Sequence, residues 1–230
     1  MLYTEQNVRD NLRNRDGKRV FFLGKNDRLT ASARDWLNRE RIPILPAEEA
    51  KPDLYRLSGG GFLREKPEHL THLHADVLIP KTHPRIAFRG AMDLLESEIM
   101  LCQLNTDPEI CRQLGDILRL ARELIRCDVL DTSLPEGKLC GLDEQELRSR
   151  SHRPQDFYGQ PHFMPEYTDG AALLQLNRAR CIARYAECKA VEAFSDREGI
   201  PTRTDIIRAL NRMSSMLWIL MIQMKKSMEK

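Results

Sequence analysis

The sequence predicts an all-α helical bundle that carries a small N-terminal α+β appendage. Apolar residues recur at helical spacing from Ala91 to near the end of the chain, whereas a strand-like stretch, "KRVFFLG", stands near its start. Residues 43–87 lie between these parts and are rich in Pro, Gly and His, as linkers and loops are. We therefore predict an appendage and linker over residues 1–65 and a bundle domain over residues 66–230.

Within the appendage we expect one strand and one helix. Residues 18–24 form the predicted strand, and residues 29–42, "LTASARDWLNRERI", form the predicted helix. Thr30 or Ser32 stands near the start of that helix, where a side-chain oxygen can cap it. The following segment, 43–87, contains "SGGGF" and "PKTHPR" and is predicted to be linker and functional loop.

The bundle is expected to contain four long helices, of which the first two pack antiparallel across a short turn. Asp107 and Pro108 separate a first helix, periodic from Ala91, from a second that runs to about Ile125. Residues 131–169 are predicted to be a long loop with one short helix at 143–149, because Pro and Gly interrupt them repeatedly. The chain then closes with two long helices, about 171–196 and 203–228, separated by "REGIP".

Composition narrows the functional classes. The chain has 230 residues and a net charge of only +2, which gives no global field for nucleic acid or an anionic membrane. The longest apolar run, Met216 to Ile222, is far short of the roughly 20 residues of a membrane span, and no signal pattern follows Met1. We therefore expect a cytoplasmic protein. The six cysteines show no C-x-x-C spacing, so in a reducing cytosol we expect them to act as small apolar side chains.

Charged residues interrupt the predicted inner face of the third long helix. Arg180, Arg184 and Glu187 fall on a stripe that also contains Leu173, Leu176, Val191 and Phe194. A buried charge is costly unless it is paired or faces a ligand. Asp93, on one flank of the first bundle helix with Arg89 and Glu96, is the expected partner of one of the arginines. The alternative is a set of ordinary interhelix salt bridges with solvated charged groups.

Three stretches, "KTHPRIAFRGAMDLLESEI", "FMPEYTDGAALLQLNRARCIARYAE" and "ALNRMSSMLWILM", resemble motifs of ATP:corrinoid adenosyltransferases in order and separation. The ethanolamine-utilisation branch is most similar, through its "LTxxARxxL", "KPxxLTHLxAD", "GLxxxELxxxSH" and "LNRLSS" segments. The resemblance implies transfer of the adenosyl group of ATP to a Co(I) corrinoid, with ATP, Mg²⁺ and cobalamin as ligands. It also implies a helical bundle of that family's type and a homo-oligomer, most often a trimer with ATP between bundles.

The resemblance also assigns roles to individual residues. Asp93 matches a carboxylate that pairs with an essential arginine. The R-x-x-x-R-x-x-E spacing selects Arg180, Arg184 and Glu187, whereas counting from the preceding Leu-Leu pair selects Arg178. Other positions match the nucleotide-contacting Asn-Arg pair and the phosphate-binding loop, namely Asn211, Arg212, Lys81 and Arg85. An Asn that caps or bridges helices is the alternative for Asn211.

Several features depart from the family pattern. A phenylalanine that walls off cobalt in other branches matches His162, with Phe163 beside it, so either a wall or a His near cobalt is implied. The phosphate loop T-K-x-G-D-x-G and the ethanolamine branch's Cys-Cys-x-x-Cys metal cluster are absent from the sequence. The histidines of "HLTHLH" lack a carboxylate or thiolate at ligand spacing, so we assign no metal ligands.

Two other classes of function remain open from the sequence. One is a non-catalytic relative that stores or delivers adenosylcobalamin or acts as an assembly component, and the other is a plain helical interaction module. For the transferase, the resemblance implies a reductase or an adenosylcobalamin-dependent enzyme as partner. It also gives a bacterial microcompartment as one setting for a cytoplasmic protein.

Overall fold

The computed structural model describes residues 2–15, 17–47 and 54–229 and divides the chain into two compact units, Met1–Lys81 and Thr82–Lys230. The sequence predicts a boundary at residue 65, whereas in the structure residues 66–81 belong to the first unit. The chain is mainly helical, but the strands of its first unit limit the all-α description to the second unit. None of the described helices is long and apolar enough to cross a membrane.

The first half of unit one confirms the predicted strand and helix. Its strands form two small sheets, with β1 parallel to β4, and with β3 between antiparallel β2 and parallel β5. Helix α2 begins where the Thr30 hydroxyl accepts a hydrogen bond from the Ala33 amide, and it packs Trp36 and Leu37 against Phe21 of β3. The elements are β1 (Leu2–Tyr3), α1 (Glu5–Asp10), β2 (Arg13–Arg15), β3 (Lys18–Leu23), β4 (Arg28–Leu29), α2 (Ala31–Arg39) and β5 (Ile44–Pro46).

The prediction of linker and loop over residues 43–87 is confirmed for the turns at 58–61, 64–69, 75–76 and 81–83, but it is wrong for the strands between them and for the start of α3 (Pro84–Leu104). Besides β5, the segment forms a four-stranded sheet in the order β7-β6-β9-β8, and residues 48–53 lie outside the described chain. Very short strands give almost no periodic signal, and β9 is buried at three consecutive positions instead of alternating. The strands are β6 (Tyr55–Leu57), β7 (Phe62–Leu63), β8 (Leu70–His74) and β9 (Val77–Pro80).

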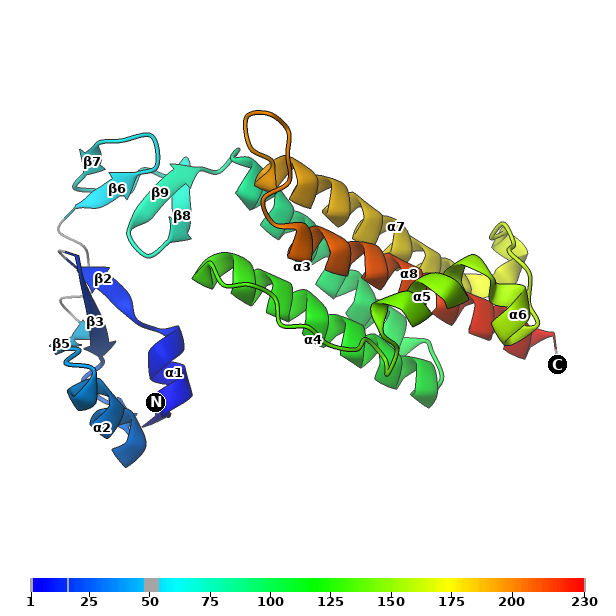
Figure 1. Ribbon diagram of the computed structural model, residues 1–230, viewed down its shortest axis with the longest axis horizontal. Coiled ribbons are helices and arrows are strands. Elements are labelled where there is room, and N and C mark those ends of the chain that lie inside the picture. The colour runs from blue at the N-terminus through cyan, green and yellow to red at the C-terminus, as the bar shows by residue number, and fades with distance from the viewer. Residues whose placement is uncertain (1, 16, 48–53, 230) are drawn as a thin grey trace. The chain divides into compact units, whose positions relative to one another are not determined.

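The described part of the second unit contains four long α-helices, two short ones and a 3-10 turn at Tyr167–Asp169. Figure 1 shows the long helices arranged as a bundle. Helix α3 packs against α4 and α7, α7 packs against α8, and α5 lies along α8. The four long helices were predicted, although α3 begins at Pro84 rather than near Ala91, and α6 was not expected. The helices are α3 (Pro84–Leu104), α4 (Pro108–Leu130), α5 (Glu144–His152), α6 (Pro154–Tyr158), α7 (Gly170–Phe194) and α8 (Thr204–Met228).

Local sequence explains where these helices begin. The Asp107 carboxylate accepts hydrogen bonds from the Glu109 and Ile110 amides, with Pro108 at the first helical position of α4. Asp143 and Glu146 form a reciprocal capping box at the start of α5. Each cap satisfies amides that the first helical turn leaves without partners.

The cysteines differ in how deeply they are buried, and burial sets the pKa of the thiol. Cys102 and Cys127 are buried as small apolar side chains, whereas Cys181 and Cys188 are exposed on α7. All six thiols are free. Burial raises the pKa of Cys102 to about 12, so this thiol is protonated at neutral pH.

Candidate functional site

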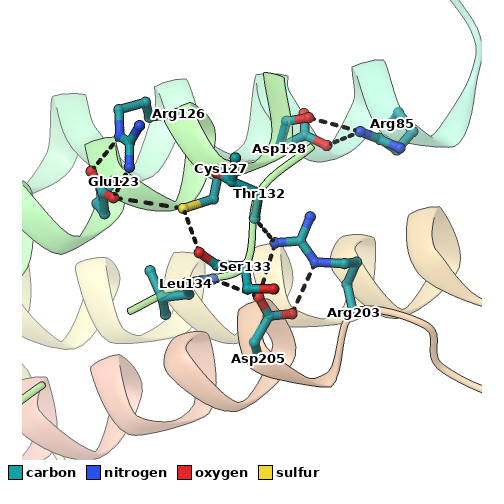
Figure 2. Close-up of polar contacts among 10 residues, drawn as sticks. All are labelled: Arg85, Glu123, Arg126, Cys127, Asp128, Thr132, Ser133, Leu134, Arg203 and Asp205. Carbon is teal, nitrogen blue, oxygen red and sulfur yellow. Dashed lines mark hydrogen bonds and ion pairs between the residues drawn. The ribbon is translucent and has the colours of Figure 1, made fainter. Parts of the chain in front are cut away.

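A buried carboxylate on α4 holds the start of α3. Both Arg85 and Arg89 reach Asp128, whose side chain is fully buried: Arg85 Nη2 lies 2.5 Å and Arg89 Nε 2.6 Å from its oxygens. Arg85 Nη2 also donates to the Asp128 carbonyl at 3.0 Å, and its guanidinium lies 5.0 Å from the ring centre of Phe194. Arg85, predicted to bind phosphate, is thus engaged in a structural ion pair, which Figure 2 shows.

A second arginine fixes the segment after α4 to the start of α8. Figure 2 shows Arg203 between the Thr132 carbonyl and the Asp205 carboxylate, with 2.9 Å hydrogen bonds to both. Asp205 also accepts the Leu134 amide at 2.9 Å. The hydrogen bonds from Arg203, and then those from backbone amides, lower the pKa of Asp205 to about 2. This carboxylate is therefore ionised at all ordinary pH values.

The arginines of α7 lie on the flank of the helix rather than on its inner face. Its buried stripe consists of Leu173, Leu176, Ala179, Ala183, Ala186, Ala190 and Phe194. Val191, predicted to point inward, is 38% exposed. Arg180 and Glu187 are half-buried, whereas Arg184 is exposed and makes no hydrogen bond or ion pair within the described part of the chain.

The predicted ion pair of Asp93 with an arginine of α7 does not form within the described chain. Asp93 is exposed, and its carboxylate has no described partner, while the neighbouring Glu98 pairs with Arg178 instead. The two acids are five residues apart on α3, or about 140° around the helix. Glu98 points at α7, whereas Asp93 faces solvent.

A chain of polar contacts connects α7, α8 and α5. The Asn211 amide donates to Glu187 Oε1 at 3.0 Å and accepts from Arg212 Nη2 at 2.9 Å. Arg212 Nε in turn lies 3.8 Å from Glu144 of α5. The structure thus brings three predicted residues together and shows Asn211 bridging two helices, which was the alternative for this side chain.

The segment before α7 stacks on an aromatic residue of α8 that we did not predict. His162 and Phe163 both stack on Trp218, with ring centres 5.7 and 5.1 Å away. Trp218 also lies 5.4 Å from the Arg180 guanidinium. The signal in the sequence was its spacing of seven residues from Asn211, which places both on one side of α8.

Two lysines attach this segment to the end of α8. Lys225 forms an ion pair with Asp169, whose pKa it lowers through a hydrogen bond, and Lys226 Nζ donates to the Tyr158 carbonyl at 2.5 Å. His162 Nε2 lies 3.2 Å from the His152 carbonyl of α5. The segment that carries His162 and Phe163 is therefore attached to α8 on both sides of the stacked rings, at Tyr158 and at Asp169.

The remaining predicted anion ligand, Lys81, belongs to the first unit. Its Nζ lies 2.6 Å from Glu68, and this hydrogen bond lowers the pKa of the Glu68 carboxyl. In the "HLTHLH" stretch, His72 Nδ1 lies 2.9 Å from the Ala75 carbonyl and its ring lies near Tyr55. Among the residues that the structure describes, no group of three or more His, Cys, Asp or Glu side chains could hold a metal ion.

Asp128 and Glu98 are structural residues that the sequence prediction missed. Asp128 follows Ala121 and Leu124 at the seven- and four-residue spacing of a core position. An acid at a core position could have been recognised in the sequence as a structural residue, because a buried carboxylate needs a cation beside it.

A family model described as cobalamin adenosyltransferase matches residues 62–224. Among curated proteins, the corrinoid adenosyltransferase EutT of Salmonella typhimurium is 34% identical over 158 residues, which cover 69% of this chain and 59% of that protein. EutT of Escherichia coli K12 is 32% identical with the same coverage. The chain thus spans about 59% of the length of these relatives.

Among solved structures, the chain is similar to a variant PduO-type ATP:corrinoid adenosyltransferase from Lactobacillus reuteri that was complexed with cobalamin and ATP. The similarity has a TM-score of 0.49 at 16% sequence identity and covers 76% of this chain and 90% of that one.

Proposed function

Because the chain belongs to the cobalamin adenosyltransferase family, we propose that it transfers the 5′-deoxyadenosyl group of ATP to the Co(I) centre of a reduced corrinoid. The cobalt electron pair attacks C5′ and forms a Co–C bond, while the C5′–O bond breaks and its electron pair leaves with triphosphate. Since the corrinoid substrate is itself the nucleophile, the protein has to orient C5′ and stabilise the leaving anion.

The cationic flank of α7 is the observation that carries this proposal. Arg180 and Arg184 lie one turn apart, and the Arg184 guanidinium has no partner within the described residues, so it is available to an anion. Next to these arginines, Asn211 Nδ2 donates a hydrogen bond of 3.0 Å to Glu187 Oε1, which holds both side chains in place. We assign the leaving triphosphate to the two arginines and nucleotide contact to Asn211 and Arg212.

The stacked rings on Trp218 support a corrinoid position at the other end of this flank. Arg180 contacts Trp218, which in turn holds His162 and Phe163, so a planar macrocycle at these rings would lie next to the arginine. We assign Phe163 as the wall against cobalt, because one nitrogen of His162 already faces a backbone carbonyl.

We further propose that the active assembly is a homotrimer, in which Asp93 pairs with Arg180 or Arg184 of a neighbouring copy. The exposure of Asp93 and Arg184 supports this pairing, since each charge lacks a described partner within its own chain. Mg²⁺ would enter with ATP, because triphosphate oxygens bind it readily and the described residues supply no carboxylate cage. A reductase, an adenosylcobalamin-dependent enzyme and a microcompartment are the proposed partners and setting.

The proposal is tested by following adenosyl transfer through the change in the visible absorption spectrum of the corrinoid. The full chain is mixed with MgATP and chemically reduced cob(I)alamin, and formation of the Co–C product is followed. We expect Arg184→Gln to reduce the rate by about 10²-fold or more, as loss of a donor to a developing anion does. Arg112→Gln, which removes an exposed arginine paired with Glu109 on α4, is the control and should leave the rate unchanged. Equal rates for wild type and Arg184→Gln would refute the assignment.

One observation favours a carrier of adenosylcobalamin as the second candidate. Arg85 and Lys81, which the family resemblance assigns to phosphate, are both engaged with carboxylates in the structure. A carrier would bind adenosylcobalamin but yield no Co–C product from ATP. A plain interaction module would bind neither, so calorimetric titration with MgATP and with adenosylcobalamin separates the three functions.

A further inference from the structure

An open groove in the second unit shares only Arg212 with the residues assigned to the proposed reaction. It lies between α4, the segment 134–143 and the first turns of α5 and α8, and its volume is about 1090 Å³. A volume of this order accommodates a nucleotide-sized ligand. We call it the α4–α5–α8 groove.

Two arginines of α8 converge on one carboxylate in this groove. Arg208 Nη1 lies 3.7 Å and Arg212 Nε 3.8 Å from the two oxygens of Glu144. These distances are within ion-pair range but too long for hydrogen bonds. The Arg212 Nε–H is buried and has no hydrogen-bond partner among the described residues. The guanidinium pair is therefore only partly satisfied by Glu144.

Most other acids of the groove already have their own cations. Asp116 pairs with Arg119, Glu123 with Arg126, and Asp205 with Arg203. Asp143 is the cap of α5, where it accepts the Glu146 amide. Glu136 and Lys138 are both exposed and offset each other in charge.

Apart from these pairs, the groove has two cations, Arg208 and Arg212, and two carboxylates, Glu144 and the α5 cap Asp143, and only Glu144 lies within ion-pair distance of the arginines. Helix α5, nine residues long, also begins at the groove, and a helix N-terminus favours an anion. Glu144 stands at the first position of that helix, so one carboxylate occupies both favourable positions at once.

We propose that the α4–α5–α8 groove binds a phosphate or polyphosphate group at Arg208 and Arg212, with Glu144 as an internal competitor that the ligand displaces. A phosphate offers more acceptor oxygens than a carboxylate and can take hydrogen bonds from both guanidinium groups. The displaced Glu144 is half-exposed, so its charge can return to water at low cost.

The groove and the proposed nucleotide site share the side chain of Arg212. Arg212 contacts Asn211 through Nη2 and faces Glu144 through Nε, so one guanidinium spans both. The inference itself does not depend on the proposed transferase, because it concerns anion binding in the absence of corrinoid.

Isothermal titration of the full chain with sodium tripolyphosphate at low ionic strength tests the proposal. Glu144→Gln removes the competitor and should tighten binding roughly two- to five-fold, the range that an exposed ion pair is worth. Arg208→Gln should weaken binding and should abolish the gain in a double variant with Glu144→Gln. Titration with orthophosphate and with ATP shows whether a single phosphate suffices or a nucleotide is preferred.

Glu109→Gln is the matched control, since it neutralises another acid in the first turn of a helix but outside the groove. An equal effect of Glu109→Gln and Glu144→Gln would overturn the proposal, because the gain would then reflect net charge alone. Binding that Arg184→Gln abolishes and Glu144→Gln leaves unchanged would also overturn it, since the anion would belong to α7. Absence of binding in every variant would overturn it as well, while leaving adenosyl transfer to be judged by its own test.

Discussion

Arg178 of α7 and Glu98 of α3 form an ion pair across two packed helices, with Arg178 Nε 3.1 Å from Glu98 Oε2. The Glu98 side chain is 3% exposed, whereas that of Arg178 is 66% exposed. A nearly buried carboxylate thus relies on a cation that reaches it from the surface. We infer that this pair has a structural role, and that the proposed chemistry belongs to Arg180 and Arg184.

Loss of Arg178 should destabilise the bundle. Arg178→Met keeps the apolar stem of the side chain but leaves the Glu98 carboxylate without its cation, so we expect a loss of about 1–3 kcal/mol. Urea unfolding measures the change. Arg112→Met, which breaks an exposed pair within α4, should change stability by less than about 0.5 kcal/mol. Equal unfolding midpoints for Arg178→Met and wild type would contradict the structural role.

Asp128 should be among the acids whose loss destabilises the bundle most. Asp128→Asn conserves volume but removes the negative charge shared by Arg85 and Arg89, whose side chains are only 19% and 18% exposed. We expect a loss of roughly 3 kcal/mol in the free energy of unfolding, measured in urea.

The control for this variant is Asp131→Asn, three residues further along. Asp131 is exposed and has a left-handed backbone with φ of 52°, which Asn tolerates. Its substitution should change stability by at most about 0.5 kcal/mol. Similar losses of stability for the two variants would contradict the claim that Asp128 stabilises the bundle through its ion pairs with Arg85 and Arg89.

Asp205 should make stability depend on pH in the acid range. Its folded pKa, lowered to about 2 chiefly by the hydrogen bonds from Arg203, lies below the ordinary Asp pKa of 3.8. A lowered folded pKa stabilises the native state above the unfolded pKa, and this contribution disappears as pH falls from about 5 toward 2. The shift corresponds to about 2 kcal/mol.

The measurement compares urea unfolding of wild type and Asp205→Asn from pH 6 to pH 2. Wild type should be more stable at pH 6, and the difference should shrink steadily as Asp205 becomes protonated. Parallel pH profiles would be incompatible with the Arg203–Asp205 contact described above.

Periodicity over long stretches was enough to place most of the bundle. Helices α7 and α8 each run 25 residues and bury a continuous apolar stripe, so their positions follow from the order of residues alone. The strands of unit one gave no comparable signal, because each is too short to repeat a pattern and is stabilised by partners elsewhere in the chain.

The long helices, the appendage and the family motifs could be predicted from the sequence, since these depend on the identity and spacing of nearby residues. The sequence could not decide which charges meet. Asp93 and Glu98 lie on the same helix, and the rotation of α3 against α7 decided that Glu98 receives the arginine. In the same way, helix packing placed Arg85 on Asp128 and Trp218 beside Arg180. Contacts between distant residues depend on how helices rotate and pack, and only the tertiary structure fixes that.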